Sequence, residues 1–144
     1  MVDPQSLDEV DVLTRTVYGE ARGESEDGQA AVAWVIMNRV AAGHLYMGRS
    51  IREVCLKPYQ FSCWDRGDVN RSILINLDTN SDGYRRILRV VKQVLNGTRH
   101  DNTHGSTHYH ANYIQPDWAN GRSPLAIICF TIILLDILNP YHNK

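Results

Sequence analysis

The segment at residues 27–42 limits the possible folds of this chain more than any other. It contains AAVAWVIMNRVAA, opens with an acidic residue that suits a helix N-terminus, and is followed by Gly43. Apolar residues occur on nearly all sides of this predicted helix until Asn38 and Arg39. A helix without a polar face must be enclosed by other elements. We therefore expect it at the centre of one globular domain.

Three further helices are predicted around this segment. Apolar residues recur at three- and four-residue intervals over residues 7–18, which predicts a helix with one apolar face. A capping-box pattern at residues 50–53 begins a short helix that Pro58 terminates. Residues 81–97 predict another, from a Ser-Asp start to an Asn-Gly end.

The remaining segments predict loop and strand. Residues 59–82 are rich in Ser, Asn, Asp and Gly and predict a long surface loop, whereas residues 107–114 alternate like a short strand or hairpin arm. Residues 125–138, LAIICFTIILLDIL, are shorter than the ~20 residues that cross a bilayer and include Asp136. They favour a buried strand or helix, with a membrane-surface or aggregation-prone tail as the alternative. The expected class is α+β, mainly α, with a small late β hairpin.

Composition excludes several kinds of partner. The 15 basic and 16 acidic residues give a formal charge of -1, which offers no general attraction to nucleic acid or an anionic membrane.

The start, MVDPQSLDEVDVL, lacks the basic and then apolar pattern of a signal peptide, so we expect synthesis in the cytoplasm without one. Cys55, Cys63 and Cys129 include no CxxC pair and predict buried thiols rather than disulfides or a zinc site.

The stretch VYGEARGE places Glu20 and Glu24 four residues apart. On one helix the two carboxylates would share a face. An apolar wall there would raise the pKa of one and keep it protonated, as glycosidic cleavage requires. The other interpretation is a set of ordinary surface ion pairs with Arg15, Arg22 or Arg39. Spacing alone does not decide between them.

Four of the six histidines lie within HDNTHGSTHYH at residues 100–110. In a strand, His108 and His110 would point to the same side, and His104 could approach across a turn. The three could hold zinc, although their spacing matches no defined zinc motif. The other interpretation is hydrogen-bonding or substrate-cleft histidines.

Several aromatic residues fall in predicted loops or strands. They suit either the core or the walls of a carbohydrate groove, in which nearby amide side chains would reach sugar hydroxyls. This set is Tyr59, Phe61, Trp64, Tyr109, Tyr113 and Trp118.

Three blocks of the chain, in this order, resemble the SleB-type cell wall hydrolase family of spore-cortex-lytic enzymes and phage lysins. They are VYGEARGESEDGQAAVAWVIMNRV, KPYQFSCWD and GSTHYHANYIQPDWA. The resemblance implies a lysozyme-like domain over residues 1–128 that cleaves the glycan strands of peptidoglycan, as a lytic transglycosylase or muramidase, without a cofactor. Residues 129–144 depart from the family's usual closing strand and would form a divergent C-terminal tail.

The resemblance also implies roles for individual residues. Glu20 would be the single catalytic general acid and base. We expect Arg22 and Glu24 to support it by charge pairing, and Asn38 and Arg39 by hydrogen bonds to its segment. The substrate cleft would be lined by Gln60, Phe61, Ser62, Tyr109, His110 and Trp118. A two-carboxylate hydrolase would take its second acid from Glu24, Asp65 or Asp68.

Two other functions stay open. One is a metal-dependent cell wall amidase or peptidase using His104, His108 and His110, and the other is a non-catalytic wall-binding virion protein on the same fold. We expect a monomer without stable membrane insertion. It would reach the cell wall or periplasm by phage holin-dependent release or as part of a virion.

Overall fold

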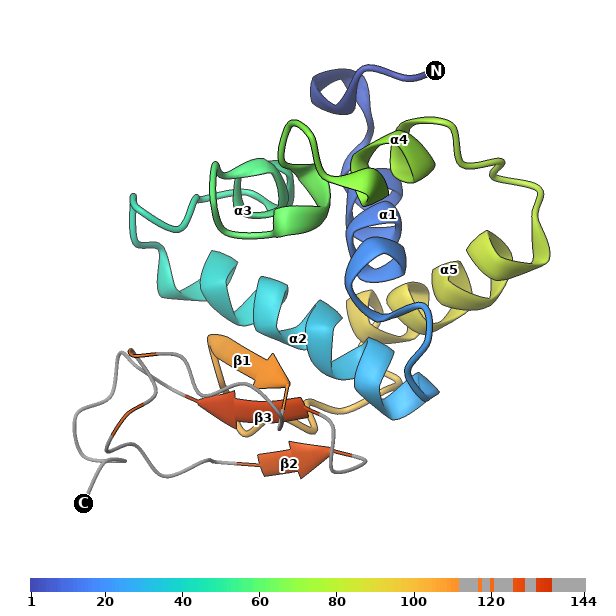
Figure 1. Cartoon of the computed structure of the whole chain (residues 1–144). Coiled ribbons are helices and arrows are strands. Elements are labelled where there is room, and N and C mark those ends of the chain that lie inside the picture. The colour runs from blue at the N-terminus through green and yellow to red at the C-terminus, as the bar shows by residue number, and fades with distance from the viewer. Residues whose placement is uncertain (112–116, 118–119, 121–125, 129–131, 136–144) are drawn as a thin grey trace.

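A computed structural model of the chain describes residues 1–111, 117, 120, 126–128 and 132–135. Helices form one part of the described structure, and a small sheet lies against one end of it (Figure 1). The helices are α1 (Glu9–Ala21), α2 (Glu26–Ala42), α3 (Ile51–Leu56), α4 (Val69–Ile75) and α5 (Asp82–Leu95), with short 3-10 helices η1 (Pro4–Ser6) and η2 (Ser62–Trp64). The strands are β1 (His108–Ala111), β2 (Ala126–Ile128) and β3 (Ile132–Leu135).

Helix α2 is the buried central helix that the sequence predicts. The Ser25 side chain caps its start by accepting from the Gly28 N–H at 3.2 Å, and Gly43 ends it with a left-handed φ of 68°. Residues 30–33, Val35 and Ile36 are almost fully buried. The helix contacts α1, α3, α5 and β1, so it joins the helices to the sheet.

Helix α1 differs from its prediction in length and in burial. It ends at Ala21 rather than near Tyr18, and residues 12–17 are buried on every side rather than along one face. The apolar pattern missed this burial because three consecutive core residues, Thr14, Arg15 and Thr16, are polar.

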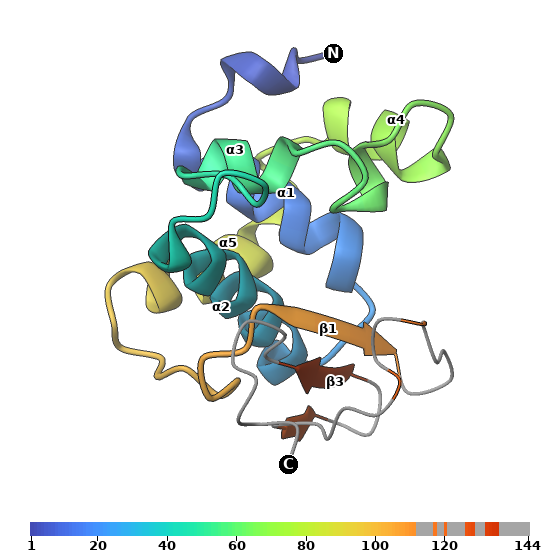
Figure 2. The same ribbon diagram turned by 90° about the vertical axis from the view of Figure 1, so that its left-hand side faces the viewer.

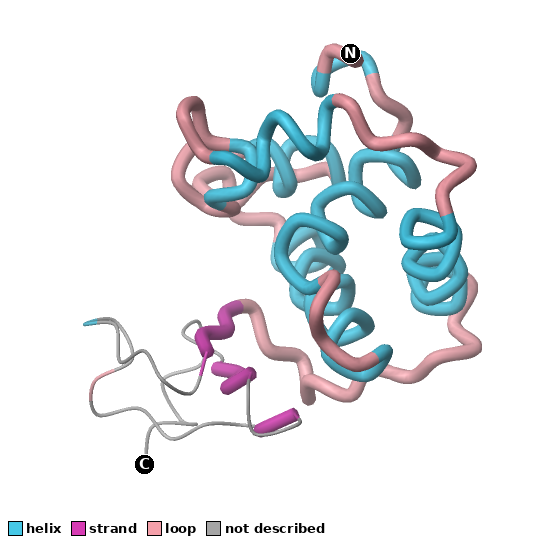
Figure 3. Tube along the Cα trace, turned by 45° about the vertical axis from the view of Figure 1, so that its right-hand side comes forward, coloured by secondary structure: helices cyan, strands magenta, loops and turns pink. Residues whose placement is uncertain are grey.

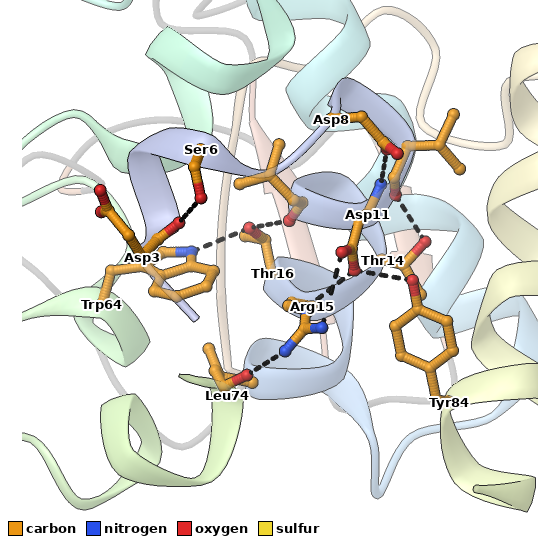
Figure 4. A network of polar contacts seen from close by, with 12 residues as sticks. Asp3, Ser6, Asp8, Asp11, Thr14, Arg15, Thr16, Trp64, Leu74 and Tyr84 are labelled. Atoms are coloured by element: carbon orange, nitrogen blue, oxygen red, sulfur yellow. Dashed lines mark hydrogen bonds and ion pairs between the residues drawn. The ribbon is translucent and has the colours of Figure 1, made fainter. Parts of the chain in front are cut away.

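Hydrogen bonds compensate for this burial (Figure 4). The Arg15 guanidinium donates to the Leu74 carbonyl at 2.6 Å and to the Asp11 carboxylate at 2.7 Å. Asp11 also accepts from the Tyr84 hydroxyl at 2.7 Å, which links α1 to α5. Because Thr14, Arg15 and Thr16 each have a hydrogen-bond partner, the core tolerates them. The bonds of Arg15 and Asp11 also fix how α4 and α5 pack on α1.

Residues 59–82 are not the long surface loop that their composition predicts. They contain η2 and α4, and Phe61, Cys63, Trp64 and Leu74 are buried in the core. The Trp64 indole N–H donates to the Thr16 hydroxyl at 2.9 Å. A few widely spaced apolar residues therefore attach this polar stretch to α1.

Helices α3 and α5 confirm their predicted starts. Ser50 caps α3 by accepting from the Glu53 N–H, and Ser81 caps α5 by accepting from the Tyr84 N–H. Helix α5 packs its apolar face on α1 and α2.

The sheet is antiparallel with strand order β1-β3-β2. In its register, Tyr109 pairs with Leu134, and Ile127 pairs with Ile133. Figures 2 and 3 show β1 as the strand beside the helices, in line with its contacts to α2. The strand predicted at residues 107–114 is present over His108–Ala111, and its later residues lie outside the described part.

The apolar segment at residues 125–138 contributes two strands, β2 and β3. Strand β3 lies within residues 129–144, where the sequence predicts a divergent tail, yet it is the middle strand of the sheet. The division at residue 128 stays a prediction. Among the described residues, no helix has the length and apolar character needed to span a bilayer.

Candidate active site

Glu20 lies in the last turn of α1, facing β1. The Tyr109 hydroxyl donates a hydrogen bond to Glu20 Oε1 at 2.9 Å, across 89 positions of sequence. The Cys63 thiol, in η2, lies close enough to the Glu20 carboxyl group to favour its charged form. Three separate elements therefore hold this half-buried carboxyl group in one orientation.

A cleft of about 430 Å³ opens beside Glu20. Its walls come from α1, α2, the loop before η2, and β1. The lining residues are Glu20, Arg39, Tyr59, Gln60, Phe61, His108 and Tyr109. Aromatic rings, amide and imidazole groups, one cation and one carboxyl group thus line one concave surface, as expected of a ligand-binding cleft.

Burial raises the pKa of Glu20 above that of an ordinary glutamate. The hydrogen bond from Tyr109 and the nearby thiol of Cys63 act in the opposite direction, because they favour the carboxylate. The negative charge of Asp68 raises the pKa, and the positive charge of Arg39 lowers it. Burial is the largest of these effects, so Glu20 keeps its proton to a higher pH and is suited to proton donation.

Arg39 connects the walls of the cleft. Its Nε donates to the Thr107 carbonyl at 2.7 Å, and its Nη1 donates to Gln60 Oε1 at 3.2 Å. The guanidinium carbon lies 5.0 Å from the centre of the Phe61 ring. Since Arg39 is almost fully buried, it fixes the start of β1 against the loop at residues 59–61.

Gly19 explains how Cys63 comes so close to Glu20. A β-carbon at Gly19 would lie 2.8 Å from Cys63 Cβ and 2.9 Å from Leu74 Cδ1, closer than side chains normally approach. Only glycine lets η2 and α4 pack directly on the end of α1 at this point.

Arg22 and Glu24 do not support Glu20 by charge pairing, contrary to the sequence-based expectation. Helix α1 ends at Ala21, so Glu20 and Glu24 do not share one helix face. The Arg22 guanidinium donates to Asn70 Oδ1 at 2.9 Å and stacks over Tyr18. Within residues 1–111 neither Arg22 nor Glu24 forms an ion pair, and both line a different cavity.

Asn38 and Arg39 also differ from expectation, because they bind the approach to β1 rather than the segment around Glu20. The Asn38 amide donates to Asp101, to Thr103 and to the Ser106 carbonyl at 3.0 to 3.2 Å. Asn38 therefore stabilises the turn before β1, while only Arg39 reaches the cleft.

The predicted substrate-binding residues separate into three groups. Gln60, Phe61 and Tyr109 line the cleft, although Phe61 is also part of the core. Ser62 is exposed at the start of η2, and His110 is buried on β1; neither lines the cleft. Trp118 lies outside the described residues, as does Tyr113.

The predicted histidine cluster does not form a metal site in the described part of the chain. His104 is exposed in a turn with a left-handed φ of 54°, whereas His108 lines the cleft and accepts or donates a hydrogen bond with Thr107. No group of three metal-binding side chains converges among the described residues. His108 and His110 do share strand β1, but His104 does not line the cleft that His108 lines.

The candidates for a second carboxylate are also separated. Glu24 and Asp65 line other cavities. Asp68 is near enough to raise the pKa of Glu20, but its carboxylate caps α4 by accepting from the Asn70 N–H at 2.8 Å. None of the three lines the cleft beside Glu20.

Sequence reasoning missed the position of Cys63. The sequence correctly predicted that Cys55 and Cys63 are buried, reduced thiols. It did not predict that Cys63 lies beside Glu20. A signal was present, because KPYQFSCWD includes this cysteine and Gly19 precedes Glu20. The contact between them depends on tertiary packing that spacing does not reveal.

Comparison with known proteins gives consistent matches. A sequence model described as Cell Wall Hydrolase matches residues 23–129, a range that begins just after Glu20. The spore cortex-lytic enzyme of Bacillus subtilis (strain 168) is 36% identical over 64 residues, which are 44% of this chain and 20% of that protein. The chain therefore spans about a fifth of that relative's length.

Two solved structures share the fold. The catalytic domain of the Bacillus cereus SleB protein has a TM-score of 0.69 at 25% identity, covering 88% of this chain and 89% of that one. The catalytic domain of the germination-specific lytic transglycosylase SleB from Bacillus anthracis has a TM-score of 0.68 at 25% identity, covering 92% and 100%. These similarities confirm the predicted mainly helical, lysozyme-like α+β class.

Proposed function

Since this chain belongs to the cell wall hydrolase family, we propose that it cleaves the glycan strands of peptidoglycan with Glu20 as its general acid. The observation that carries this proposal is a half-buried carboxyl group with a raised pKa in a mixed polar and aromatic cleft. A glycosidic bond breaks readily only when its leaving oxygen receives a proton.

The cleft suits a mechanism with one carboxyl group. Protonated Glu20 donates its proton to the oxygen between N-acetylmuramic acid and N-acetylglucosamine as that bond breaks. The resulting carboxylate then accepts the proton of the attacking hydroxyl group. Tyr109, held 2.9 Å from Glu20, orients the carboxyl group during both steps, and Arg39 offsets its developing negative charge.

We infer that the attacking group is the C6 hydroxyl of the muramic acid residue, which yields a 1,6-anhydro product. A hydrolase with two carboxylates needs a second acid beside the scissile bond, and Glu24, Asp65 and Asp68 do not line this cleft. The transglycosylase name of the Bacillus anthracis relative agrees with this choice.

Digestion of purified peptidoglycan tests the proposal. We expect the native chain to release anhydro-muropeptides, detected by mass spectrometry, and Glu20→Gln to lower the rate by at least about 100-fold. Glu24→Gln is the matched control, because this carboxylate lies nearby in sequence but lines another cavity. It should keep nearly full activity.

Other products would point to the alternatives. Reducing muramic acid ends without the anhydro ring would indicate water as the acceptor, and cleaved amide bonds that depend on a chelatable metal would indicate the amidase or peptidase. Binding without any product would indicate a wall-binding module. Release from a phage-infected cell, carriage in a virion and the monomeric state stay predictions.

A further inference from the structure

A second and larger cavity, of about 800 Å³, adjoins the Glu20 cleft. It lies between the N-terminal segment at residues 3–5, the end of α3, and the chain from η2 to α4. Tyr59 lines both cavities, so the two lie next to each other at this residue. The catalytic mechanism proposed above makes no use of the second cavity.

Tyr59 has an unusual conformation at this junction. The residue is 91% exposed, and its φ of 65° is in the left-handed region that a bulky residue rarely adopts. Neither core packing nor backbone preference accounts for an aromatic residue here. Unfavourable local geometry of this kind is often retained where it positions a side chain for a ligand.

Cations predominate along the second cavity. Lys57, Arg66 and Arg71 line it, against the acids Asp3 and Asp65. Among the described residues, none of these five forms an ion pair with another. The cations thus keep charge available for an anionic ligand.

The cations differ in how firmly they are held. Arg71 Nη1 donates to the Trp64 carbonyl at 2.7 Å, which fixes the guanidinium at the wall, and Lys57 Nζ donates to the Leu45 carbonyl at 3.3 Å. Arg66 is exposed and is the most accessible donor for a carboxylate. The Trp64 indole N–H is already bonded to Thr16, so this ring offers the cavity an apolar wall.

We propose that this cavity binds the short peptide that peptidoglycan carries on its muramic acid residues. The proposal rests on the proposed function, because that peptide hangs from the sugar whose bond Glu20 would cleave. The glycan backbone is uncharged where its muramic lactyl groups are amide-linked to the peptide, whereas the peptide itself carries free carboxylates that match Lys57, Arg66 and Arg71. With the sugar beside Glu20, the peptide passes Tyr59 and its carboxylates meet these cations.

Titration of the full chain with a soluble stem tetrapeptide, followed by NMR, tests the site without requiring catalysis. We expect shifts of amide signals at Lys57, Tyr59 and Arg71, with affinity that falls as salt concentration rises. Arg66→Glu should weaken binding by roughly tenfold. Arg85→Glu, an exposed arginine of α5 outside both cavities, is the matched control and should bind as the native chain does.

A second measurement connects binding to turnover. Peptide-bearing strands should have a lower KM than strands stripped of peptides by an amidase, and Arg66→Glu should raise the KM far more for the former. Absence of peptide binding, or binding unaffected by Arg66→Glu, would overturn the peptide site even if Glu20-dependent cleavage is observed. Peptide binding at this cavity with undiminished cleavage by Glu20→Gln would instead leave the site standing and remove the proposed catalysis.

Discussion

Glu20 is subject to opposing influences that set when it carries a proton. Burial favours the neutral carboxyl group, whereas the hydroxyl of Tyr109 and the thiol of Cys63 favour the carboxylate. A general acid works only while protonated, so activity should fall as the pH rises through the raised pKa of Glu20. Each of the two donors can therefore be tested by the direction in which its removal moves this pH limit.

Tyr109→Phe should move the alkaline limit of activity to higher pH. The substitution keeps the ring but removes the hydrogen bond that lowers the pKa of Glu20. We expect kcat/KM at its optimum to fall about fivefold, from the loss of an orienting bond worth ~1 kcal/mol. The measurement is the pH profile of kcat/KM on solubilised glycan strands.

Tyr84→Phe is the control for this experiment, because it removes a similar bond to a carboxylate, Asp11, away from the cleft. It should lower stability and leave the pH profile in place. An alkaline limit that stays fixed or moves to lower pH in Tyr109→Phe would contradict the assigned role of this hydrogen bond.

Glu20→Gln should stabilise the protein while it inactivates the enzyme. In the unfolded chain Glu20 ionises near the ordinary pKa of 4.5, and in the folded chain burial raises that pKa. Below the unfolded value both states hold the proton, so the two proteins should be equally stable. Above the folded value the native protein must bury a charge that glutamine lacks, so the variant should be more stable there.

Urea denaturation at acidic, neutral and alkaline pH measures this difference. Glu24→Gln should show no comparable gain, because its carboxylate is outside the buried site. A gain in Glu20→Gln that is the same at every pH would mean that the charge of Glu20 is not its cause.

At the scale of elements, the position of Glu20 depends on how closely η2 and α4 approach α1. Gly19 permits that approach, and Gly19→Ala tests it. Alanine favours a helix over glycine by ~1 kcal/mol, but here its β-carbon would meet Cys63 and Leu74 below 3 Å. Overpacking typically costs about 1–3 kcal/mol, so we expect a net loss of stability together with reduced activity.

Gly23→Ala is the matched control for Gly19→Ala. No atom lies within 4 Å of its added β-carbon, and its backbone is not in the left-handed region. Its free energy of unfolding should change by no more than about 0.5 kcal/mol. Equal effects of the two substitutions in chemical denaturation would show that packing at Gly19 is not special.

Sequence predicted the elements best where local chemistry determines them. Ser50 and Ser81 marked helix starts correctly, and the all-round apolar pattern of residues 30–36 identified the buried helix. The sequence predicted the helix α1 but not the burial of Arg15 against Leu74 and Asp11, because only the folded chain supplies these partners. Polar composition likewise concealed η2 and α4.

The site was predictable to a similar extent. Residues carried by motif blocks, such as Glu20, Gln60 and Tyr109, do line one cleft. Arg22 and Glu24, which were expected to support Glu20, line a different cavity, because α1 ends at Ala21 before them. The sequence-based prediction placed Glu20 and Glu24 on one helix, whereas α1 ends at Ala21.

At the scale of the whole molecule, the cleft lies where the helical part meets the sheet. Glu20 comes from the helices and Tyr109 from β1, so the catalytic contact depends on both parts. Strand β1 pairs with β3, and β3 pairs with β2 on its other side. The last described strand of the chain thus holds in place the strand that carries Tyr109.

Shortening the chain tests this dependence. A chain ending at residue 128 lacks β3 and leaves β1 without its neighbour, whereas a chain ending at residue 135 keeps all three strands. We expect the shorter chain to retain helical circular dichroism, since α1, α2 and α5 pack on one another, but to melt at a lower temperature. Its product release should fall at least about tenfold relative to the longer chain, because Tyr109 would no longer be fixed against Glu20. If the chain ending at residue 128 matches the other in melting temperature and activity, β3 does not position the site, and the helices with β1 alone must suffice.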